Sequence, residues 1–344
     1  MTRTNPGATH ARAHATTHAL DAPRQPAALA AGIVVAVTAL LALVAIAFAL
    51  PAARSGPHDV PIGAAGPQAA GGRIGAVLDE KMPGAFVVTY YPGEAALADA
   101  IRSREVYGGI ALPAEPGDRP ALLIASGGSP VIAQLLTQVG GELSRQIGVP
   151  LRIEDLAPPT AADPRGAGLA ASALPITLAG ILPAIALILT LRRALWTGFV
   201  AAVAFSGVAG LTIAALLRYV LGSIDANLWG VAAGLALGVA AALLFMFGLG
   251  ALFGRVGLVI GALLALLVGN PLSGLASAPQ MLPAGMGQLG QLLPQGATAT
   301  LLRSTAAFGG AGASAAILVL TCWAAAGTAL VVTAAVRDRK AVPT

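Results

Sequence analysis

Histidine is the residue type in this sequence whose spacing comes nearest to a chemical site. His10, His14 and His18 recur every four residues, a spacing that would align three imidazoles on one helix face as metal ligands. The surrounding tail is punctuated by Thr, Ala and Pro and has no apolar face, which predicts a disordered segment whose histidines need no ligand. The fourth histidine, His58, lies apart from them. We therefore expect no metal site and no cofactor.

Nucleophiles and phosphate-binding loops give no better support for an enzyme. Cys322, the only cysteine, lies in an apolar run without a histidine, so the pairing that activates a thiol nucleophile is missing. The sequence contains no Gly-x-x-x-x-Gly-Lys-Ser/Thr loop, and both lysines, Lys81 and Lys340, lie elsewhere. We predict that the chain is not an enzyme and does not bind ATP through such a loop.

The composition indicates a membrane protein. Apolar residues make up 56% of the chain and charged residues only 10%, whereas a soluble domain normally carries about 25% charged residues. So few charges cannot cover a water-exposed surface. The calculated pI near 10.0 would suit a nucleic-acid partner, but the basic residues flank apolar runs and form no broad basic face. This distribution argues against nucleic acid and makes membrane lipid the expected partner.

Six apolar runs are predicted to be transmembrane helices. Residues 27–50 carry no charge and would reach about 36 Å, enough to cross a hydrocarbon core of about 30 Å. This run is too long for the apolar core of a cleaved signal peptide, so we expect it to remain as an anchor. The other five runs cover residues 169–191, 195–217, 228–250, 256–270 and 314–336.

The positions of the arginines predict the orientation of these helices. With the N-terminus in the cytoplasm, Arg192, Arg193, Arg255 and the basic residues from Arg337 onward all fall on the inner side. We therefore predict a multi-pass protein of the bacterial cell membrane with both ends cytoplasmic, where residues 1–26 and 337–344 form tails. No predicted span contains Asp, Glu, Lys or His, which argues against a proton-coupled carrier.

Residues 51–168 are predicted to form an extracytoplasmic α/β domain between the first and second helices. A stretch rich in Pro, Gly and Ala at 51–70 indicates a linker. Helices and strands then alternate, and Ser129-Pro130 is a typical helix start, with a capping hydroxyl followed by proline. The expected helices cover 72–82, 94–102 and a stretch from 130, and the expected strands cover 86–90, 106–112, 121–125 and 151–155. The predicted fold class is thus a polytopic α-helical membrane protein of six transmembrane helices with one inserted α/β domain.

Glycines spaced by four residues predict close packing of the membrane helices. Such small-residue ridges let helix backbones approach each other in lipid, either within one bundle or in a dimer, and lining a pore is the alternative. A homodimer or hetero-oligomer is therefore expected. The glycines concerned are Gly230, Gly234 and Gly238 in one run, and Gly257 and Gly261 in the next.

The segment 270–313 is apolar but contains four prolines between 271 and 294, which forbid one continuous span. We predict that it forms short helices lying at, or dipping into, the outer membrane surface, within the five-helix domain of 169–336. Arg303 would then lie near that surface. It would either extend to the interface in the manner of snorkelling arginines or contact lipid phosphate or an anionic substrate.

Several of these segments resemble a known family. The chain resembles the last conserved block of type 2 ABC exporter permeases at Gly269-Asn270-Pro271-x-x-Gly274, Pro279, Leu282-Pro283, Leu293-Pro294-x-Gly296 and Leu302-Arg303. One span, a large outer domain and five further spans resemble the phage-infection-protein (YhgE/Pip) branch of that superfamily. Two segments of the outer domain, 101–109 and 163–166, are also similar to segments of those proteins. The resemblance covers roughly residues 27–336.

This resemblance implies a permease fold that exports lipids, glycans or drugs with a separate ATPase subunit. Those permeases usually present an amphipathic helix before the first span and a cytoplasmic coupling helix between the second and third. Here the corresponding inner loop is little more than Arg192-Arg193-Ala194. Two functions therefore stay open. One is a permease subunit of an ABC-type exporter, and the other is a non-transporting scaffold or receptor that acts through its outer domain.

Overall fold

The structure is a computed structural model that describes residues 24–113 and 119–341. It consists of two units, residues 1–45 and residues 46–344. The first unit holds most of helix α1 (Arg24–Ala53), which begins three residues before the predicted span. The predicted disordered tail, with His10, His14 and His18, falls almost entirely outside the described residues.

Five helices in the described residues are long and apolar enough to cross a membrane. The chain is therefore a polytopic helical protein, as its composition predicts. These helices cover Pro26–Ala53, Ala167–Leu191, Leu195–Val220, Leu228–Phe253 and Ser314–Arg339. The run predicted at 256–270 differs, because it forms α9 (Arg255–Leu264) followed by the π-helical turn η2 (Ala265–Gly269). Together these would reach only about 22 Å.

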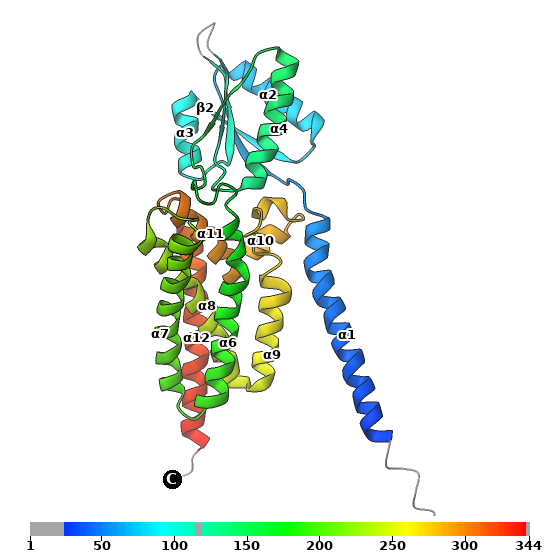
Figure 1. The fold of residues 1–344 in the computed structure, drawn as a ribbon, viewed down its shortest axis with the longest axis vertical. Coiled ribbons are helices and arrows are strands. Elements are labelled where there is room, and N and C mark those ends of the chain that lie inside the picture. Colours follow the sequence, from blue (N-terminus) through cyan, green and yellow to red (C-terminus); the bar gives the residue numbers. More distant parts are fainter. Residues whose placement is uncertain (1–23, 114–118, 342–344) are drawn as a thin grey trace, which may run out of the picture. The chain divides into compact units, whose positions relative to one another are not determined.

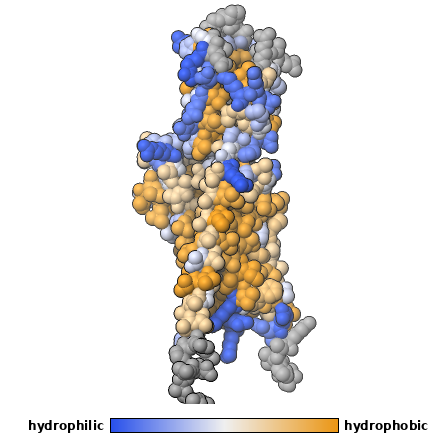
Figure 2. Space-filling view, turned by 90° about the vertical axis from the view of Figure 1, so that its right-hand side faces the viewer, coloured by the Kyte–Doolittle hydropathy of each residue, from blue (hydrophilic) through white to orange (hydrophobic). Residues whose placement is uncertain are grey.

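The second unit contains a helix bundle around one central helix. Helix α8 (Leu228–Phe253) contacts α6 (Ala173–Leu191), α7 (Leu195–Ala215), α9 and α12 (Ser314–Ala341). Leu235, Leu243 and Phe247 of α8 are completely buried among these neighbours. Large hydrophobic side chains are exposed on the outer faces of the bundle, among them Leu189, Val208 and Leu318. Figure 2 shows hydrophobic side chains over the middle of the helical part, and hydrophilic ones over the α/β domain and at the opposite end of the helices. A bundle with a buried central helix and a hydrophobic exterior suits a lipid surrounding.

The α/β domain is a three-layer structure. Its five-stranded sheet has the order β2-β1-β3-β4-β5, and every neighbouring pair is parallel except β3 and β4. Helices α2 and α4 cover one face, where Ile74 and Ile132 are buried, and α3 covers the other face with Leu97 and Ile101. The elements are β1 (Val60–Ala65), α2 (Gln68–Lys81), β2 (Phe86–Tyr91), α3 (Glu94–Arg102), β3 (Gly108–Ala111), β4 (Ala121–Ile124), α4 (Pro130–Ile147) and β5 (Arg152–Asp155).

One boundary predicted from the sequence is wrong. The linker predicted at 51–70 contains strand β1, which pairs with both β2 and β3 inside the sheet. Its small and apolar residues fill the interior of the sheet, where Val60 and Ala64 are buried. At the other end of the chain, α12 continues to Ala341 and so includes the first residues of the tail predicted from 337, whose cytoplasmic position stays a prediction.

The segment 270–313 turns back into the bundle, and we refer to it as the re-entrant segment. It forms the 3-10 turn η3 (Pro279–Met281), α10 (Met286–Gln291) and α11 (Pro294–Ala307). Thr298 of α11 lies against Gly238, close to the middle of α8, and the later Leu301 lies against Gly234. Helix α11 therefore begins deep in the bundle and runs toward the end where the α/β domain lies (Figure 1). Its first residues are buried in protein, which satisfies the requirement for irregular backbone at such depth.

Candidate functional site

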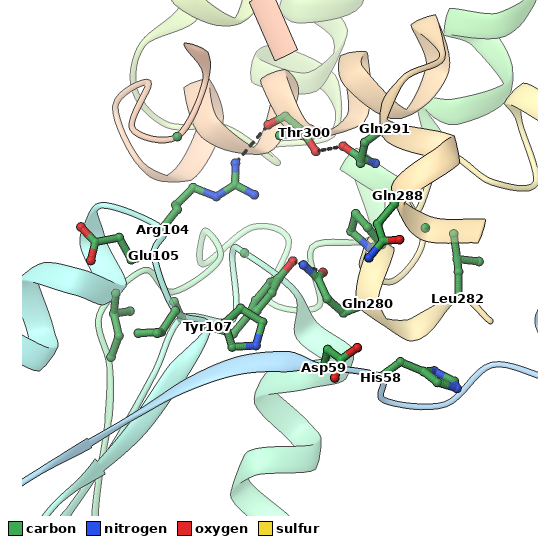
Figure 3. A pocket seen from close by; sticks show the side chains of 18 of the residues that line it. His58, Asp59, Arg104, Glu105, Tyr107, Gln280, Leu282, Gln288, Gln291 and Thr300 are labelled. Atoms are coloured by element: carbon green, nitrogen blue, oxygen red, sulfur yellow. Dashed lines mark hydrogen bonds between the residues drawn. The ribbon is translucent and has the colours of Figure 1, made fainter. Parts of the chain in front are cut away.

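A large cavity of the second unit lies between the α/β domain and the re-entrant segment. It has a volume of about 620 Å³, within the range of about 300–1,000 Å³ that is usual for small-molecule sites. We call it the junction cavity, and Figure 3 shows how its side chains lie. The polar side chains that line it are His58, Asp59, Arg104, Glu105, Tyr107, Gln280, Gln288, Gln291 and Thr300.

Backbone contacts hold the two walls of the junction cavity together. The N–H groups of Gly56 and His58 donate to the carbonyls of Met281 and Gln280, at 3.0 and 2.9 Å. Ala278 and Met281 are buried in the same apolar cluster as Val60, in the core of the α/β domain. The re-entrant segment is thus part of the domain's own core.

On another side of the junction cavity, Arg104 connects the α/β domain to α11. Its backbone has a φ of 64°, a left-handed conformation that costs a non-glycine residue roughly 1–2 kcal/mol. Its Nη1 donates to the Thr300 carbonyl at 3.1 Å and to the Ser304 hydroxyl. The guanidinium also lies over the Phe308 ring, 5.3 Å from its centroid, a cation–π arrangement. These contacts hold the unfavourable backbone conformation of Arg104 in place.

Hydrogen bonds order several of the uncharged groups around the junction cavity. The Tyr107 hydroxyl donates to Gln280 Oε1 at 2.8 Å, and the Thr300 hydroxyl donates to Gln291 Oε1 at 2.5 Å. Burial raises the pKa of Tyr107, although nearby Arg303 and Arg104 act in the opposite direction. Tyr107 is therefore a neutral hydrogen-bond donor at physiological pH. An arrangement of fixed amides, hydroxyls and one guanidinium is suited to binding a polar ligand.

Arg303, which the sequence placed near the outer surface, is buried in the structure with an exposed fraction of 4%. Its Nη2 lies 2.7, 2.5 and 3.1 Å from the carbonyl oxygens of Gly274, Leu275 and Ser277. Gly274 has a φ of 66°, which lets the loop turn around the guanidinium. Arg303 also lines a second cavity of about 150 Å³. This position gives Arg303 a structural role, and its contact with a lipid or substrate stays a prediction.

Asp163, from the second segment of the family resemblance, joins the α/β domain to the bundle. Its carboxylate accepts hydrogen bonds from the Ser223 hydroxyl at 2.7 Å and from the N–H groups of Ala167 and Gly168 at 2.9 and 2.8 Å. Partial burial raises the pKa of Asp163, but these hydrogen bonds outweigh it and lower the pKa overall. Residues 101–109 and 163–166, the two outer segments on which the expected family resemblance rests, thus both contact the helical part.

The glycines predicted to mediate helix packing lie at close contacts. A Cβ atom at Gly238 would lie 2.3 Å from the Thr298 hydroxyl oxygen, and one at Gly234 would lie 3.1 Å from Leu301. Gly257 and Gly261 face Leu249 and Met246 of α8 in the same way. Gly230 differs, because its nearest neighbour is the Asn227 side chain. Most of these glycines therefore serve contacts between helices of the same chain.

The remaining residues that could do chemistry lie apart from one another. His58 bonds to the Gly56 carbonyl through Nδ1 at 2.7 Å, and Cys322 is exposed on α12. Within residues 24–113 and 119–341, no group of three or more His, Cys, Asp or Glu could hold a metal ion. Whether the chain lacks enzymatic activity stays a prediction.

The residues of the junction cavity form no recognisable motif in the sequence. Arg104 and Tyr107 lie in the segment 101–109 that resembles the permease family, and that resemblance was the one available signal. Gln280, Gln288 and Gln291 lie among prolines and glycines, and nothing in that stretch of sequence predicts that they face residues of the α/β domain. The fold and the site define a polytopic helical protein with an inserted α/β domain and a polar cavity at their junction. Comparison of the chain with family models, with curated proteins and with solved structures finds no match.

Proposed function

We propose that the chain crosses the bacterial cell membrane six times, with both ends cytoplasmic and the α/β domain outside. In this arrangement α9 and η2 provide the sixth crossing together with the re-entrant segment. Arg192 supports a common inner side, because its Nη2 would lie 3.4 Å from a Cβ atom at Gly254, which precedes Arg255. The charges at the α6–α7 and α8–α9 turns therefore lie at the same end of the bundle, as the positive-inside rule requires.

Cysteine labelling tests this topology. In a Cys322→Ser background, Arg102→Cys should react with a membrane-impermeant maleimide in intact cells, because α3 would lie outside. Asp338→Cys should react only after the cells are permeabilised, because the end of α12 would lie inside. Labelling of both positions from the same side would disprove the six-span arrangement.

We further propose that the chain is a permease-like subunit of an ABC-type exporter that works with a separate ATPase. The junction cavity is the main support for this function. One of its walls is the re-entrant segment, whose α11 packs against the central helix α8. A displacement of α8 would move Thr300 and Gln291 relative to Arg104, and would change the cavity. In this way, ATP hydrolysis by a subunit at the inner side would change the shape of the junction cavity at the outer side.

Purification with a mild detergent tests the proposed partner. A tagged chain from its native membrane should retain a subunit with a Gly-x-x-x-x-Gly-Lys-Ser/Thr loop in a fixed ratio, and the complex should hydrolyse ATP. Reversing the charge of the inner turn with Arg192→Glu and Arg193→Glu should weaken that association, whereas the outer substitution Arg102→Glu should leave it unchanged. A folded chain that never retains such a subunit would contradict the exporter function.

A scaffold or receptor is the second candidate, and the shape of the inner turns favours it. Only Arg192, Arg193 and Ala194 separate α6 from α7, and only Gly254 separates α8 from α9. Neither turn has room for a coupling helix. If no ATPase associates with the chain, the outer domain and its junction cavity remain as the functional part, and a ligand would be bound there without transport.

A further inference from the structure

Arg104 is a half-buried cation without an anionic partner among the described residues. In the part of the chain that the structure describes, the salt bridges involve Lys81, Arg102, Arg145 and Arg152 but not Arg104. Burial lowers the pKa of Arg104, which reflects the cost of removing its charge from water. Its hydrogen bonds to Thr300 and Ser304 use Nη1 alone, so Nε and Nη2 have no partner among the described residues.

The free edge of this guanidinium borders the junction cavity. Figure 3 shows Arg104 reaching toward Thr300, with the open space of the cavity between its guanidinium and the side chains of Gln280 and Gln288. Gln288 makes no hydrogen bond with the described residues, and its side chain is exposed to the cavity. A ligand in this space would therefore meet a free guanidinium edge on one side and a free carboxamide on the other.

The two acidic residues of the cavity wall do not neutralise Arg104. Glu105 is exposed and accepts a hydrogen bond from the Ser103 hydroxyl at 3.1 Å. Asp59 is exposed to solvent. Exposed charges are screened by water and salt, whereas a half-buried one acts more strongly over the same distance. The charge of buried Arg303 also reaches Tyr107, which adds to the positive potential there.

We propose that the junction cavity binds an anionic head group, a phosphate or a carboxylate, through the free edge of Arg104. Nη2 and Nε can donate to two oxygens of such a group at once, the geometry that makes arginine the preferred partner of both anions. The Gln288 carboxamide would donate to the same group or to a neighbouring hydroxyl. This inference deepens the proposed function by naming the ligand chemistry, and its physiological role rests on that function.

The size of the cavity favours a ligand larger than a bare ion. A volume of about 620 Å³ leaves room beyond one phosphate for the polar groups that accompany it in a lipid head group or in a unit of an envelope polymer. The amides of Gln280 and Gln291 would contact those groups. A lipid and a soluble anion share the chemistry recognised by Arg104, and the choice of probe distinguishes them.

Charge substitution at Gln288 tests the proposal without breaking a hydrogen bond of the fold. Binding of short-chain phosphatidylglycerol, of a diacylglycerol with the same acyl chains but no phosphate, and of inorganic phosphate to the purified full chain would be measured by calorimetry. We expect phosphatidylglycerol to bind at least about tenfold more tightly than the diacylglycerol, because a hydrogen bond to a charged group contributes about that factor. Gln288→Glu should weaken this binding about tenfold, whereas Gln288→Lys should preserve or strengthen it.

Substitution of Arg104 provides a second test of the proposed anion site. Arg104→Gln should abolish the preference for the anionic lipid, and Arg102→Gln, an exposed arginine on α3, should leave it intact. Because Arg104→Gln also removes contacts to α11, the opposite effects of Glu and Lys at position 288 carry the test. Phosphate that binds as tightly as phosphatidylglycerol would support a soluble anion as the ligand.

Several outcomes would overturn the anion site. Equal binding of both lipids and no binding of phosphate would exclude it, as would equal effects of Gln288→Glu and Gln288→Lys. The assay requires no ATPase, so its result is independent of the partner experiment. Anion binding without an ATPase would leave the site in a scaffold or receptor, and an ATPase partner without anion binding would leave the exporter with a different ligand.

Discussion

Replacing Gly210 with leucine should unfold the helix bundle, whereas the same replacement at Gly207, three residues earlier on α7, should be tolerated. A Cβ atom at Gly210 would lie 2.5 Å from the backbone nitrogen of Ala236 and 2.7 Å from the Ala232 carbonyl oxygen. Both atoms belong to the backbone of α8, which cannot move aside as a flexible side chain would. At Gly207 a Cβ atom would have no neighbour within 4 Å.

The expected loss of stability in Gly210→Leu depends on which atoms the new side chain would meet. Overpacking of a core usually costs about 1–3 kcal/mol, and a collision with the backbone of the central helix belongs at or above the upper end of that range. In the control, leucine gains up to about 1 kcal/mol of helix propensity over glycine. We expect Gly210→Leu to lose the monodisperse peak in detergent or to melt well below the wild type, with Gly207→Leu at or above it.

Two other results would contradict this expectation. Equal melting temperatures for Gly210→Leu and wild type would show that α7 and α8 can separate without loss of the fold. Equal damage at Gly207 would show that the outer face of α7 is covered by another helix, for example from a second copy of the chain. The second result would support the expected oligomer.

Local patterns in the sequence predict most of the α/β domain. The helix expected at 94–102 has those boundaries, and the Ser129 hydroxyl accepts the Ile132 N–H at 3.3 Å, as a capping serine should. Strand β1 was missed because Val60–Ala65 reads VPIGAA, with one proline and one glycine. Its position in the sheet is fixed by pairing with β2 and β3, and no local propensity reports such pairing.

Hydropathy predicts the long membrane helices but not how they pack. The spacing of glycines by four residues correctly predicts close contacts at Gly234 and Gly238. Gly210 and Gly327 make backbone contacts that are just as close, but neither belongs to a pair of glycines with that spacing. Their importance depends on where α7 and α12 cross α8. The short α9 shows the same limit, because length and hydropathy alone do not distinguish a short span from a helix completed by a re-entrant segment.

The junction cavity was beyond sequence analysis because its walls are distant in the chain. Arg104 and Thr300 are 196 residues apart, and Tyr107 and Gln280 are 173 residues apart. Without a catalytic motif, nothing local marks such residues as members of one site. In the structure, two residues of the cavity wall, Arg104 and Asp59, have a left-handed backbone, with φ of 64° and 49°.

Removal of the Arg303 guanidinium should destabilise the re-entrant segment more than it affects any ligand. The carbonyls of Gly274, Leu275 and Ser277 share its Nη2, and in Arg303→Met they would lose this donor together. A buried acceptor left without its hydrogen-bond partner costs about 1–3 kcal/mol, and this substitution removes the donor from three carbonyls. We therefore expect a large loss of thermal stability and faster proteolysis between residues 270 and 293.

Arg303→Lys and Arg165→Gln separate this structural role from the contact with an anionic substrate that the sequence suggested. A lysine ammonium has three donors that can serve the same carbonyls, so Arg303→Lys should retain much of the stability that Arg303→Met loses. Arg165 is exposed and lines the same 150 Å³ cavity, so Arg165→Gln should leave stability unchanged. If Arg303→Met were as stable as the wild type but bound phosphatidylglycerol more weakly, Arg303 would be a ligand contact. The loop that surrounds it would then need another explanation for its left-handed turn at Gly274.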